Sequence, residues 1–383
     1  MMHTSQIFLN KSALNHNLEF IRQIIGKHTR LSSVVKGNAY GHGIEEFVPM
    51  VKECGVNHFS VFSADEALRV SRTLADETPI MIMGMLDNDQ MEWVIENGIS
   101  FFVFEVDRLE NAVKIAKQIN RPAKVHIEIE TGMNRTGFSN REFPKILQYI
   151  KNETKHLSIK GLCTHYAGAE SIANHHRVKR QQRSYNSAYI RMVNFGIIPE
   201  IKHTACSAAT MRYPKTRMDL VRIGILQYGF FPSKEILIHY LTKHKVHDYP
   251  LKRVITWKSK VMSVKAVKTG EFIGYGTSYL ANTAMKIATV PVGYSHGFSR
   301  ALGNQGRVLI HGKRVSIVGT VNMNMMCIDV TDLEGIKKGD EVVIIGKQGD
   351  LEISVASFSD FTNQLNYELL TRLPSNIPRK IID

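Results

Sequence analysis

Two different patterns of apolar and polar residues divide the chain near Pro250. Before it, short apolar runs of strand length alternate with longer stretches whose apolar residues recur every three or four positions, as on one face of a helix. The predicted strands, after a lead-in strand at 6–9, are 31–35, 58–62, 80–83, 100–104, 124–129, 159–164, 200–205 and 220–225. The main predicted helices are 12–25, 64–74, 89–97, 107–119, 141–151 and 174–194.

About eight strands alternating with helices over roughly 230 residues predict a (β/α)₈ barrel. A doubly wound sheet is the alternative, but it more often carries a glycine-rich G-x-G-x-x-G turn, and the sequence has none.

After Pro250 the apolar segments become short, alternating and β-branched, which is typical of strands. They are 254–257, 285–292, 307–310, 315–318, 326–330 and 341–345, followed by a predicted helix near 355–364. We therefore predict two domains, a barrel over residues 1–248 and a mainly β domain over residues 249–383.

Composition adds limits to this organisation. The 383 residues are 43% apolar and 22% charged, as in an ordinary soluble protein, and no apolar run is long enough for a membrane span. The N-terminus lacks the features of a signal peptide, and the four cysteines are scattered without metal-ligand spacing, so we expect a cytoplasmic protein without a metal site. The net charge of +14 raises nucleic acid as a partner, but the basic residues are spread along the chain, which favours an anion-binding enzyme instead.

The stretch with the clearest chemistry is Val34–Gly43, which reads Val-Val-Lys-Gly-Asn-Ala-Tyr-Gly-His-Gly. Lys36 follows a predicted buried strand, and a lysine that is partly desolvated there becomes a nucleophile toward aldehydes. The nearby glycines permit close approach of a ligand to the backbone. The alternative is a surface lysine beside a turn, and this stretch alone does not decide between them.

Other polar residues also fall at the predicted carboxyl ends of the barrel strands, where barrel enzymes place their chemistry. These residues are Glu128, Glu130, His165, His203, Ser207, Arg222 and Gly224. His126, Glu128 and Glu130 share one face of the strand that begins at Lys124. Three titratable residues inside a barrel are costly unless they serve a ligand or a network, so we predict a site at this end.

The motifs resemble those of a known family. The run Val34–Gly43 is similar to the pyridoxal-phosphate signature of the alanine racemases, whose fold is a (β/α)₈ barrel followed by a β domain. The similarity continues in the family's order through 131–137, 164–167, 203–207, 221–224, 274–276, 291–294 and 321–323.

The resemblance implies pyridoxal 5′-phosphate as the cofactor and interconversion of L- and D-alanine, which supplies D-alanine for peptidoglycan. Lys36 would hold the cofactor as a Schiff base (an internal aldimine) and act as one base. Tyr275 would act as the opposite base from the other subunit, so the resemblance also implies a homodimer with shared active sites. Racemisation needs two such bases, because the proton leaves one face of Cα and returns to the other.

The resemblance assigns the remaining site residues too. The phosphate would be bound by Tyr40, Ser207 and the backbone N–H groups of Gly224 and Ile225. Arg222 would face the pyridine nitrogen, with His165 hydrogen-bonded behind it. Arg135 would contact the cofactor's phenolic oxygen and the substrate carboxylate. Met323 would help to bind the substrate.

Several positions depart from the family's commonest pattern. Glu128 stands where many members have a carbamylated lysine, and we predict that its carboxylate orients Arg135 by a charge-assisted hydrogen bond. Thr320, Asn322, Asn324 and Ser375 also differ from the usual residues near the substrate entrance. These departures leave open a racemase for serine or another amino acid.

A pyridoxal-dependent decarboxylase shares this architecture, but Tyr275 and Arg222 argue against it. A non-enzymatic carrier barrel would lack the second domain, and nucleic-acid binding is the remaining alternative.

Overall fold

The computed structural model describes residues 3–355, 358 and 366–383. They form two compact units. The first, here the barrel unit, comprises Leu14–Lys36 and Val48–Lys252, and the second, the β unit, comprises Met1–Ala13, Gly37–Phe47 and Arg253–Asp383.

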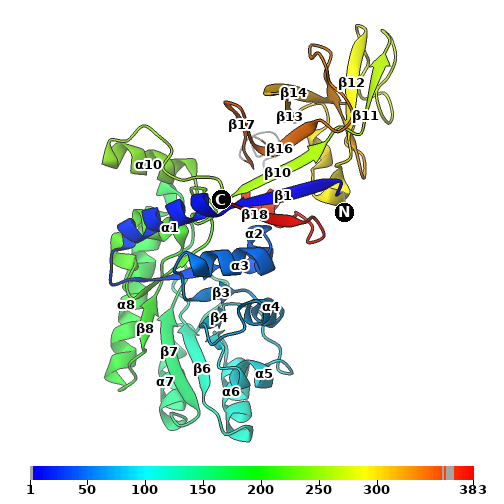
Figure 1. Ribbon diagram of the computed structural model, residues 1–383. Coiled ribbons are helices and arrows are strands. Elements are labelled where there is room, and N and C mark those ends of the chain that lie inside the picture. Colours follow the sequence, from blue (N-terminus) through cyan, green and yellow to red (C-terminus); the bar gives the residue numbers. More distant parts are fainter. Residues whose placement is uncertain (1–2, 356–357, 359–365) are drawn as a thin grey trace. The chain divides into compact units, whose positions relative to one another are not determined.

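Eight parallel strands form the nearly closed barrel of the barrel unit, in the order β8-β7-β6-β5-β4-β3-β2-β9 (Figure 1). The strands are β2 (Arg30–Val34), β3 (Phe59–Val61), β4 (Ile80–Ile82), β5 (Ser100–Val103), β6 (Ala123–Glu128), β7 (Leu157–Cys163), β8 (Ile201–His203) and β9 (Leu220–Ile223). The helices are α1 (Lys11–Ile25), α3 (Ile44–Glu53), α4 (Ala64–Leu74), α5 (Met91–Glu96), α6 (Val106–Gln118), α7 (Phe143–Asn152), α8 (His175–Asn194), α9 (Ser207–Arg212) and α10 (Lys234–His244), with short 3₁₀ turns at Ile172–Asn174 and Pro214–Thr216.

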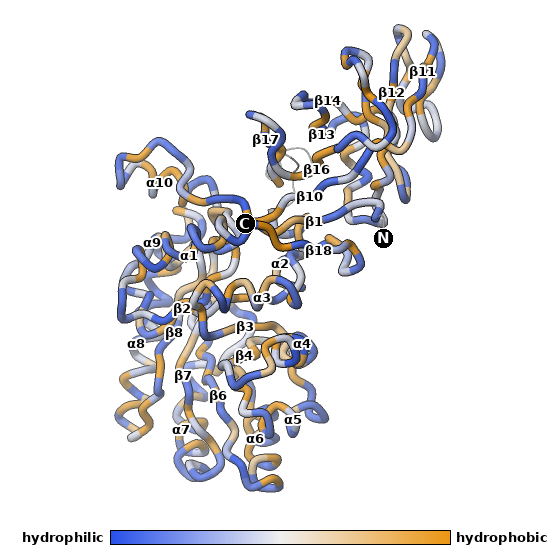
Figure 2. Tube along the Cα trace, viewed as in Figure 1, coloured by the Kyte–Doolittle hydropathy of each residue, from blue (hydrophilic) through white to orange (hydrophobic). Residues whose placement is uncertain are grey.

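Burial explains why these sequences form these elements. Strands β3, β4 and β5 are buried at every position, as expected for parallel strands covered on both faces. Helix α7 buries Phe143, Ile146, Leu147 and Ile150, the i, i+3, i+4, i+7 pattern that predicts one apolar face. Figure 2 accordingly shows hydrophobic and hydrophilic residues mixed along the helices.

The β unit contains a ten-stranded sheet in the order β11-β12-β15-β14-β13-β16-β10-β1-β18, with β17 paired to β16. The strands are β1 (Ser5–Asn10), β10 (Ile255–Lys260), β11 (Ser263–Val267), β12 (Met285–Val290), β13 (Arg307–Ile310), β14 (Lys313–Val318), β15 (Met326–Asp329), β16 (Glu341–Gln348), β17 (Leu351–Ile353) and β18 (Arg379–Ile382). The helical turns are α2 (Lys36–Tyr40), Tyr294–His296, Arg300–Leu302 and α12 (Asn366–Thr371).

The predicted fold class, a (β/α)₈ barrel followed by a mainly β domain, is confirmed. The N-terminus differs from the prediction. Strand β1 was expected to lead into the barrel, but it pairs antiparallel with β10 and parallel with β18. Its partners lie hundreds of residues later in the sequence, so local patterning does not indicate them. The boundary at residues 248 and 249 stays a prediction, and the helix expected near 355–364 lies largely outside the described residues.

Within the described part of the chain, none of the helices combines the length and the apolar character needed to cross a membrane.

Candidate active site

Lys36 follows the carboxyl end of β2, on a backbone fixed by buried side chains. The Tyr228 hydroxyl and the Gln227 amide both donate to the carbonyl of Val34, at 3.0 and 3.1 Å. The Lys36 ammonium is partly desolvated, and the charges on Arg135 and Arg222 add to this effect, so the pKa of Lys36 is lowered. A lowered pKa makes the free amine more available as a nucleophile or a base.

Arg222 lies on β9 with its guanidinium buried among acceptors from β7 and β8. It donates to Nδ1 of His203 at 2.6 Å, to the His203 carbonyl at 2.7 Å and to the Thr164 carbonyl at 2.8 Å. A buried cation with this many hydrogen bonds is held in one orientation. Arg222 therefore presents a fixed positive charge within the barrel.

A chain of two neutral histidines continues from Arg222 into the barrel. His126 and His203 are joined through Nδ1 and Nε2 at 2.9 Å, and Nε2 of His126 lies 3.1 Å from the Ser100 hydroxyl. Burial lowers the pKa of both imidazoles well below the usual range, and the charge on Arg222 lowers them further. Because arginine only donates, Nδ1 of His203 must accept, and each ring then donates from Nε2 to the next group.

The histidine bonded to Arg222 is therefore His203, whereas the prediction named His165. The ring of His165 makes no hydrogen bond to Arg222 within the described residues, and its backbone carbonyl accepts from Gln181 at 3.0 Å. Burial and the charges on Arg222, Arg135 and Lys36 lower the pKa of His165 to about 3. His165 is thus a neutral ring within the electrostatic reach of three cations.

Glu128 ends β6 and is almost fully buried. Burial raises the pKa of its carboxyl group, and a hydrogen bond from Thr136 together with the charges on Arg222 and Arg135 partly offsets that effect. The expected direct hydrogen bond to Arg135 is replaced by the bond from Thr136, the neighbour of Arg135. The carboxylate therefore acts on Arg135 through charge and through the turn that carries it.

Ser207, Gly224 and Ile225 converge where β8 and β9 end. The Ser207 hydroxyl, at the start of α9, accepts the N–H of Gly224 at 3.0 Å. Among the described residues, the N–H of Ile225 has no protein acceptor. The Ser207 hydroxyl and the N–H of Ile225 are suited to an anion, which the N–H of Gly224 can also reach once it leaves Ser207. Barrel phosphate sites are built in the loops after the seventh and eighth strands.

Tyr40 belongs to the β unit, on a segment with an unusual backbone. Residues from Gly37 to Tyr40 all have positive φ, between 51° and 62°. At Gly41, where φ is +78°, a Cβ would collide with the Leu370 carbonyl of α12, so glycine is required. The carbonyl of Gly41 accepts from Arg379 at 2.9 Å, which fixes the segment within this unit.

Tyr275 and Met323 also belong to the β unit, on two neighbouring loops. Tyr275 stands between Gly274 and Gly276, both with positive φ, and is 74% exposed, while Met323 is 56% exposed. The loops meet where the hydroxyls of Ser278 and Thr320 lie 3.1 Å apart. The carbonyl of Met323 is held by the backbone and hydroxyl of Ser295, at 3.0 and 2.7 Å.

Three further residues support the site, and two of them, Gln181 and Gln227, were not predicted. The carboxylate of Glu130, expected in the barrel mouth, accepts the backbone N–H groups of Gly132, Met133 and Asn134 and so shapes the turn before Arg135. Gln181 and Gln227 are fully buried and hold loop and strand backbones. Glu130 was predicted from its place at the end of a strand, whereas the two glutamines carry no such signal in the sequence.

Two family models match this chain. Residues 9–232 match the family model "Alanine racemase, N-terminal domain", and residues 254–381 match "Alanine racemase, C-terminal domain". The chain belongs to the alanine racemase family. The alternative of a decarboxylase is not supported, because both matched models describe alanine racemase domains.

Individual relatives agree with the alanine racemase assignment. The chain is 34% identical over 382 residues to the alanine racemase of Leptospira interrogans, covering 100% of this chain and 96% of the relative. Among solved structures, the alanine racemase of Bacillus anthracis with bound L-Ala-P has a TM-score of 0.90 at 30% identity, covering 100% of this chain and 96% of that one. The alanine racemase of Bartonella henselae, which carries covalently bound pyridoxal phosphate, has a TM-score of 0.85 at 26% identity over 100% of both chains.

Within the described ranges, no three His, Cys, Asp or Glu side chains come close enough together to hold a metal ion.

Proposed function

We propose that this protein is a cytoplasmic alanine racemase that interconverts L- and D-alanine with pyridoxal 5′-phosphate and supplies D-alanine for peptidoglycan. The observation that carries the proposal is Lys36, an amine of lowered pKa at the end of a barrel strand, in a chain that matches the alanine racemase family throughout. The direct test is to incubate the purified protein and pyridoxal phosphate with L-alanine and to measure D-alanine. Absence of D-alanine, with the cofactor bound, would contradict the proposal.

The barrel residues fit the cofactor. The amine of Lys36 suits a covalent bond to its aldehyde, and the hydroxyl of Ser207 with the N–H groups of Gly224 and Ile225 suits its phosphate. Tyr40 would complete the phosphate ligands. Pyridoxal phosphate, when bound, supplies an electron-withdrawing ring that stabilises negative charge at Cα of an amino acid.

The protein's own groups then decide the reaction. Lys36 Nζ would exchange a proton with one face of Cα, and the phenolic oxygen of Tyr275 would exchange one with the other face. Arg135 would bind the substrate carboxylate through its guanidinium, and Met323 would contact the substrate side chain. Arg222, with His203 behind it and His165 nearby, would place a group that cannot give up its proton against the ring nitrogen.

We further propose that the working unit is a homodimer in which Tyr275 acts in the site of the partner subunit. Tyr275 and Met323 are largely exposed, although both would need a substrate beside them. Apolar side chains are also exposed beyond the strand ends of the barrel unit, at Phe62 (52%) and Met85 (46%). Exposed apolar groups on both units support an interface between copies of the chain.

A mixing experiment tests the shared site. Lys36→Ala and Tyr275→Phe should each be inactive alone. When an equal mixture is unfolded and refolded, about half of the dimers should be mixed, and each mixed dimer has one site with both native bases. The mixture should therefore show about a quarter of the activity of refolded wild type. Refolded single variants are the controls. Failure of the mixture to regain activity, while refolded wild type does so, would contradict a shared site.

Glu128→Gln tests the role of the buried carboxylate. Loss of its charge should misplace Arg135 and lower kcat/KM on the order of 10- to 100-fold. The free energy of unfolding at neutral pH should not fall, since the raised pKa of Glu128 indicates that its buried charge costs stability. Glu142→Gln, at an exposed carboxylate, is the matched control. Unchanged kcat/KM in Glu128→Gln would contradict the proposed role.

The loop around Met323 is where substrate choice would depart from alanine. Thr320 bonds Ser278, and the Asn324 amide donates to Ser295 at 3.0 Å, so their polar side chains already have partners on neighbouring segments. This arrangement supports alanine as the main substrate, with a racemase for serine or another amino acid as the alternative.

A further inference from the structure

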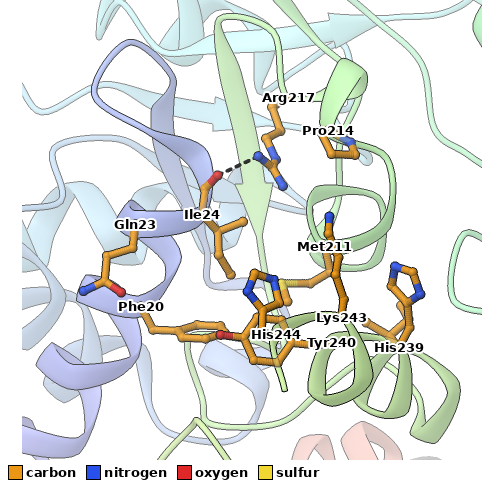
Figure 3. A pocket seen from close by; sticks show the side chains of 11 residues that line it. Phe20, Gln23, Ile24, Met211, Pro214, Arg217, His239, Tyr240, Lys243 and His244 are labelled. Carbon is orange, nitrogen blue, oxygen red and sulfur yellow. Dashed lines mark hydrogen bonds between the residues drawn. The ribbon is translucent and has the colours of Figure 1, made fainter. Parts of the chain in front are cut away.

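Two adjoining pockets lie on the outer, helical side of the barrel unit and have no part in the proposed reaction. One, here the basic pocket, has a volume of about 750 Å³ and lies between the start of α8, the end of α9 and α10. The other, here the ring pocket, has a volume of about 350 Å³ between α1, the end of α9 and α10 (Figure 3). They share Pro214 and His239, so a ligand can extend from one into the other.

The basic pocket gathers cationic side chains from separate elements. Lys179 of α8, Arg212 of α9 and Lys215 all line it, and its other lining residues include no carboxylate. Lys179 and Lys215 make no ion pair within the described residues, and the nearest partner of Arg212 is Glu235, at 3.9 Å. Three cations facing one pocket with so little compensation favour a ligand with several negative charges.

Tyr213 holds two of these cations in place. Nζ of Lys179 lies 5.7 Å from the centre of the Tyr213 ring, and Cζ of Arg212 lies 5.9 Å from it. The ring itself is buried, and its hydroxyl lies 3.4 Å from Nδ1 of His175, another lining residue. Lys179 and Arg212 therefore lie against a buried ring of the pocket wall, whereas Lys215 is exposed.

The ring pocket has a different character, with aromatic rings along one wall. Phe20 meets Tyr240 edge to face at 5.3 Å between ring centres, and His244 stacks on Tyr240 at 4.4 Å. Figure 3 shows these three rings side by side below Ile24 and Met211. Arg217 of this pocket is already bonded to the Ile24 carbonyl, at 2.6 Å. The pocket therefore offers aromatic faces for a flat ring, and Lys243 adds one positive charge at its lining.

We propose that the two pockets together bind a nucleoside polyphosphate. The phosphate chain lies in the basic pocket against Lys179, Arg212 and Lys215, since guanidinium and ammonium groups bind phosphate oxygens by charge-assisted hydrogen bonds. The base lies in the ring pocket against Tyr240 and His244, since aromatic rings stack on any base. The combined site is separate from the proposed catalytic residues and does not depend on the proposed function.

Isothermal titration calorimetry of the full-length protein tests this site. The protein is first reduced with borohydride in the presence of pyridoxal phosphate, so that the proposed cofactor site is filled, and magnesium is removed with EDTA. ATP, sodium triphosphate and adenosine are then titrated separately. We expect one ATP per chain, weaker binding of triphosphate, and the weakest binding for adenosine.

The Lys179→Gln/Lys215→Gln variant should bind ATP at least about tenfold more weakly. The matched control Lys337→Gln/Lys338→Gln removes the same charge from exposed lysines of the β unit, and ATP affinity should stay within about twofold. His244→Ala should lower the affinity for ATP but leave the affinity for triphosphate unchanged. No ATP binding by wild type at about 1 mM would overturn the proposal. So would an equal loss of affinity in the control, or equal affinities of wild type for ATP and triphosphate.

Discussion

Lys36→Ala is expected to lower the rate of alanine racemisation by at least about 10⁴-fold. The substitution removes both the amine that would hold the cofactor and one of the two proposed bases, whereas other residues of the site would lose only a contact. The surrounding backbone should keep its structure, because Gln227 and Tyr228 hold the Val34 carbonyl independently of the lysine side chain. The measurement is the initial rate of D-alanine formation with saturating pyridoxal phosphate.

Two controls test whether the loss of rate is specific to the amine of Lys36. Lys160→Ala removes a lysine of β7 that pairs with Glu200 at 2.5 Å and lies outside the proposed catalytic set, and its rate should stay within about twofold of wild type. Added methylamine should partly restore the rate of Lys36→Ala but not of Tyr275→Phe, because it can replace only the missing amine. A Lys36→Ala rate close to that of wild type would contradict the proposal that Lys36 holds the cofactor and acts as one of the two bases.

The second large effect is acid sensitivity of the barrel unit. Burial lowers the pKa of four histidines in this unit: to about 4 for His58, to about 3 for His165, and well below the usual range for His126 and His203. A histidine whose folded pKa is lowered takes up a proton more readily in the unfolded chain. The stability that it contributes is therefore complete above the unfolded pKa of about 6.5 and is lost as the pH falls below it.

Each such histidine lowers the free energy of unfolding by up to about 1.4 kcal/mol for each pH unit below pH 6.5. Four of them together lower it by about 5 kcal/mol between pH 7.5 and 5.5. Glu128 acts in the opposite direction, because its raised pKa adds stability as the pH falls through the folded value. We therefore expect the free energy of unfolding, measured by urea titration, to drop by several kcal/mol over this range.

His58→Gln isolates one of these contributions. His58 contacts the Ser32 hydroxyl through Nδ1 at 2.8 Å, a bond that the glutamine amide can replace, and it lies outside the proposed catalytic set. Between pH 7.5 and 5.5, the free energy of unfolding of the variant should fall by about 1 kcal/mol less than that of wild type. His247→Gln, at an exposed histidine, is the control and should match wild type. The same pH dependence in His58→Gln and wild type would contradict the account.

The barrel was predictable because its information is local. Each strand is a short apolar run, each helix has one apolar face, and the polar residues mark the strand ends. Strand β1 shows the limit of this approach, because its place in the β sheet depends on pairing with β10 and β18 far along the chain. The segment 37–43 likewise belongs to the β unit through contacts with α12 and β18.

The sequence supplies candidate residues for the site but not their contacts, and the roles of these residues stay predictions. Family motifs supply positions such as Lys36 and Arg222, whereas the partner of a buried group depends on how strands are staggered. His203 is the partner of Arg222 because the segment that follows β8 pairs with β9 through Ala205 and Cys206, and His165 follows the end of the next strand, β7. For the same reason, the bond from Thr136 to Glu128 could not be derived from their spacing.

Proton exchange at Cα tests the central proposal most directly. The purified protein, saturated with pyridoxal phosphate in deuterated water, is given individual L-amino acids, and the Cα–H signal and chirality are followed together. The account predicts that L-alanine loses its Cα–H signal while deuterated D-alanine appears, and that serine and other amino acids exchange much more slowly. Faster exchange of serine than of alanine would indicate that serine, not alanine, is the main substrate. A lack of exchange with every amino acid, although borohydride traps the cofactor on Lys36, would contradict racemisation altogether.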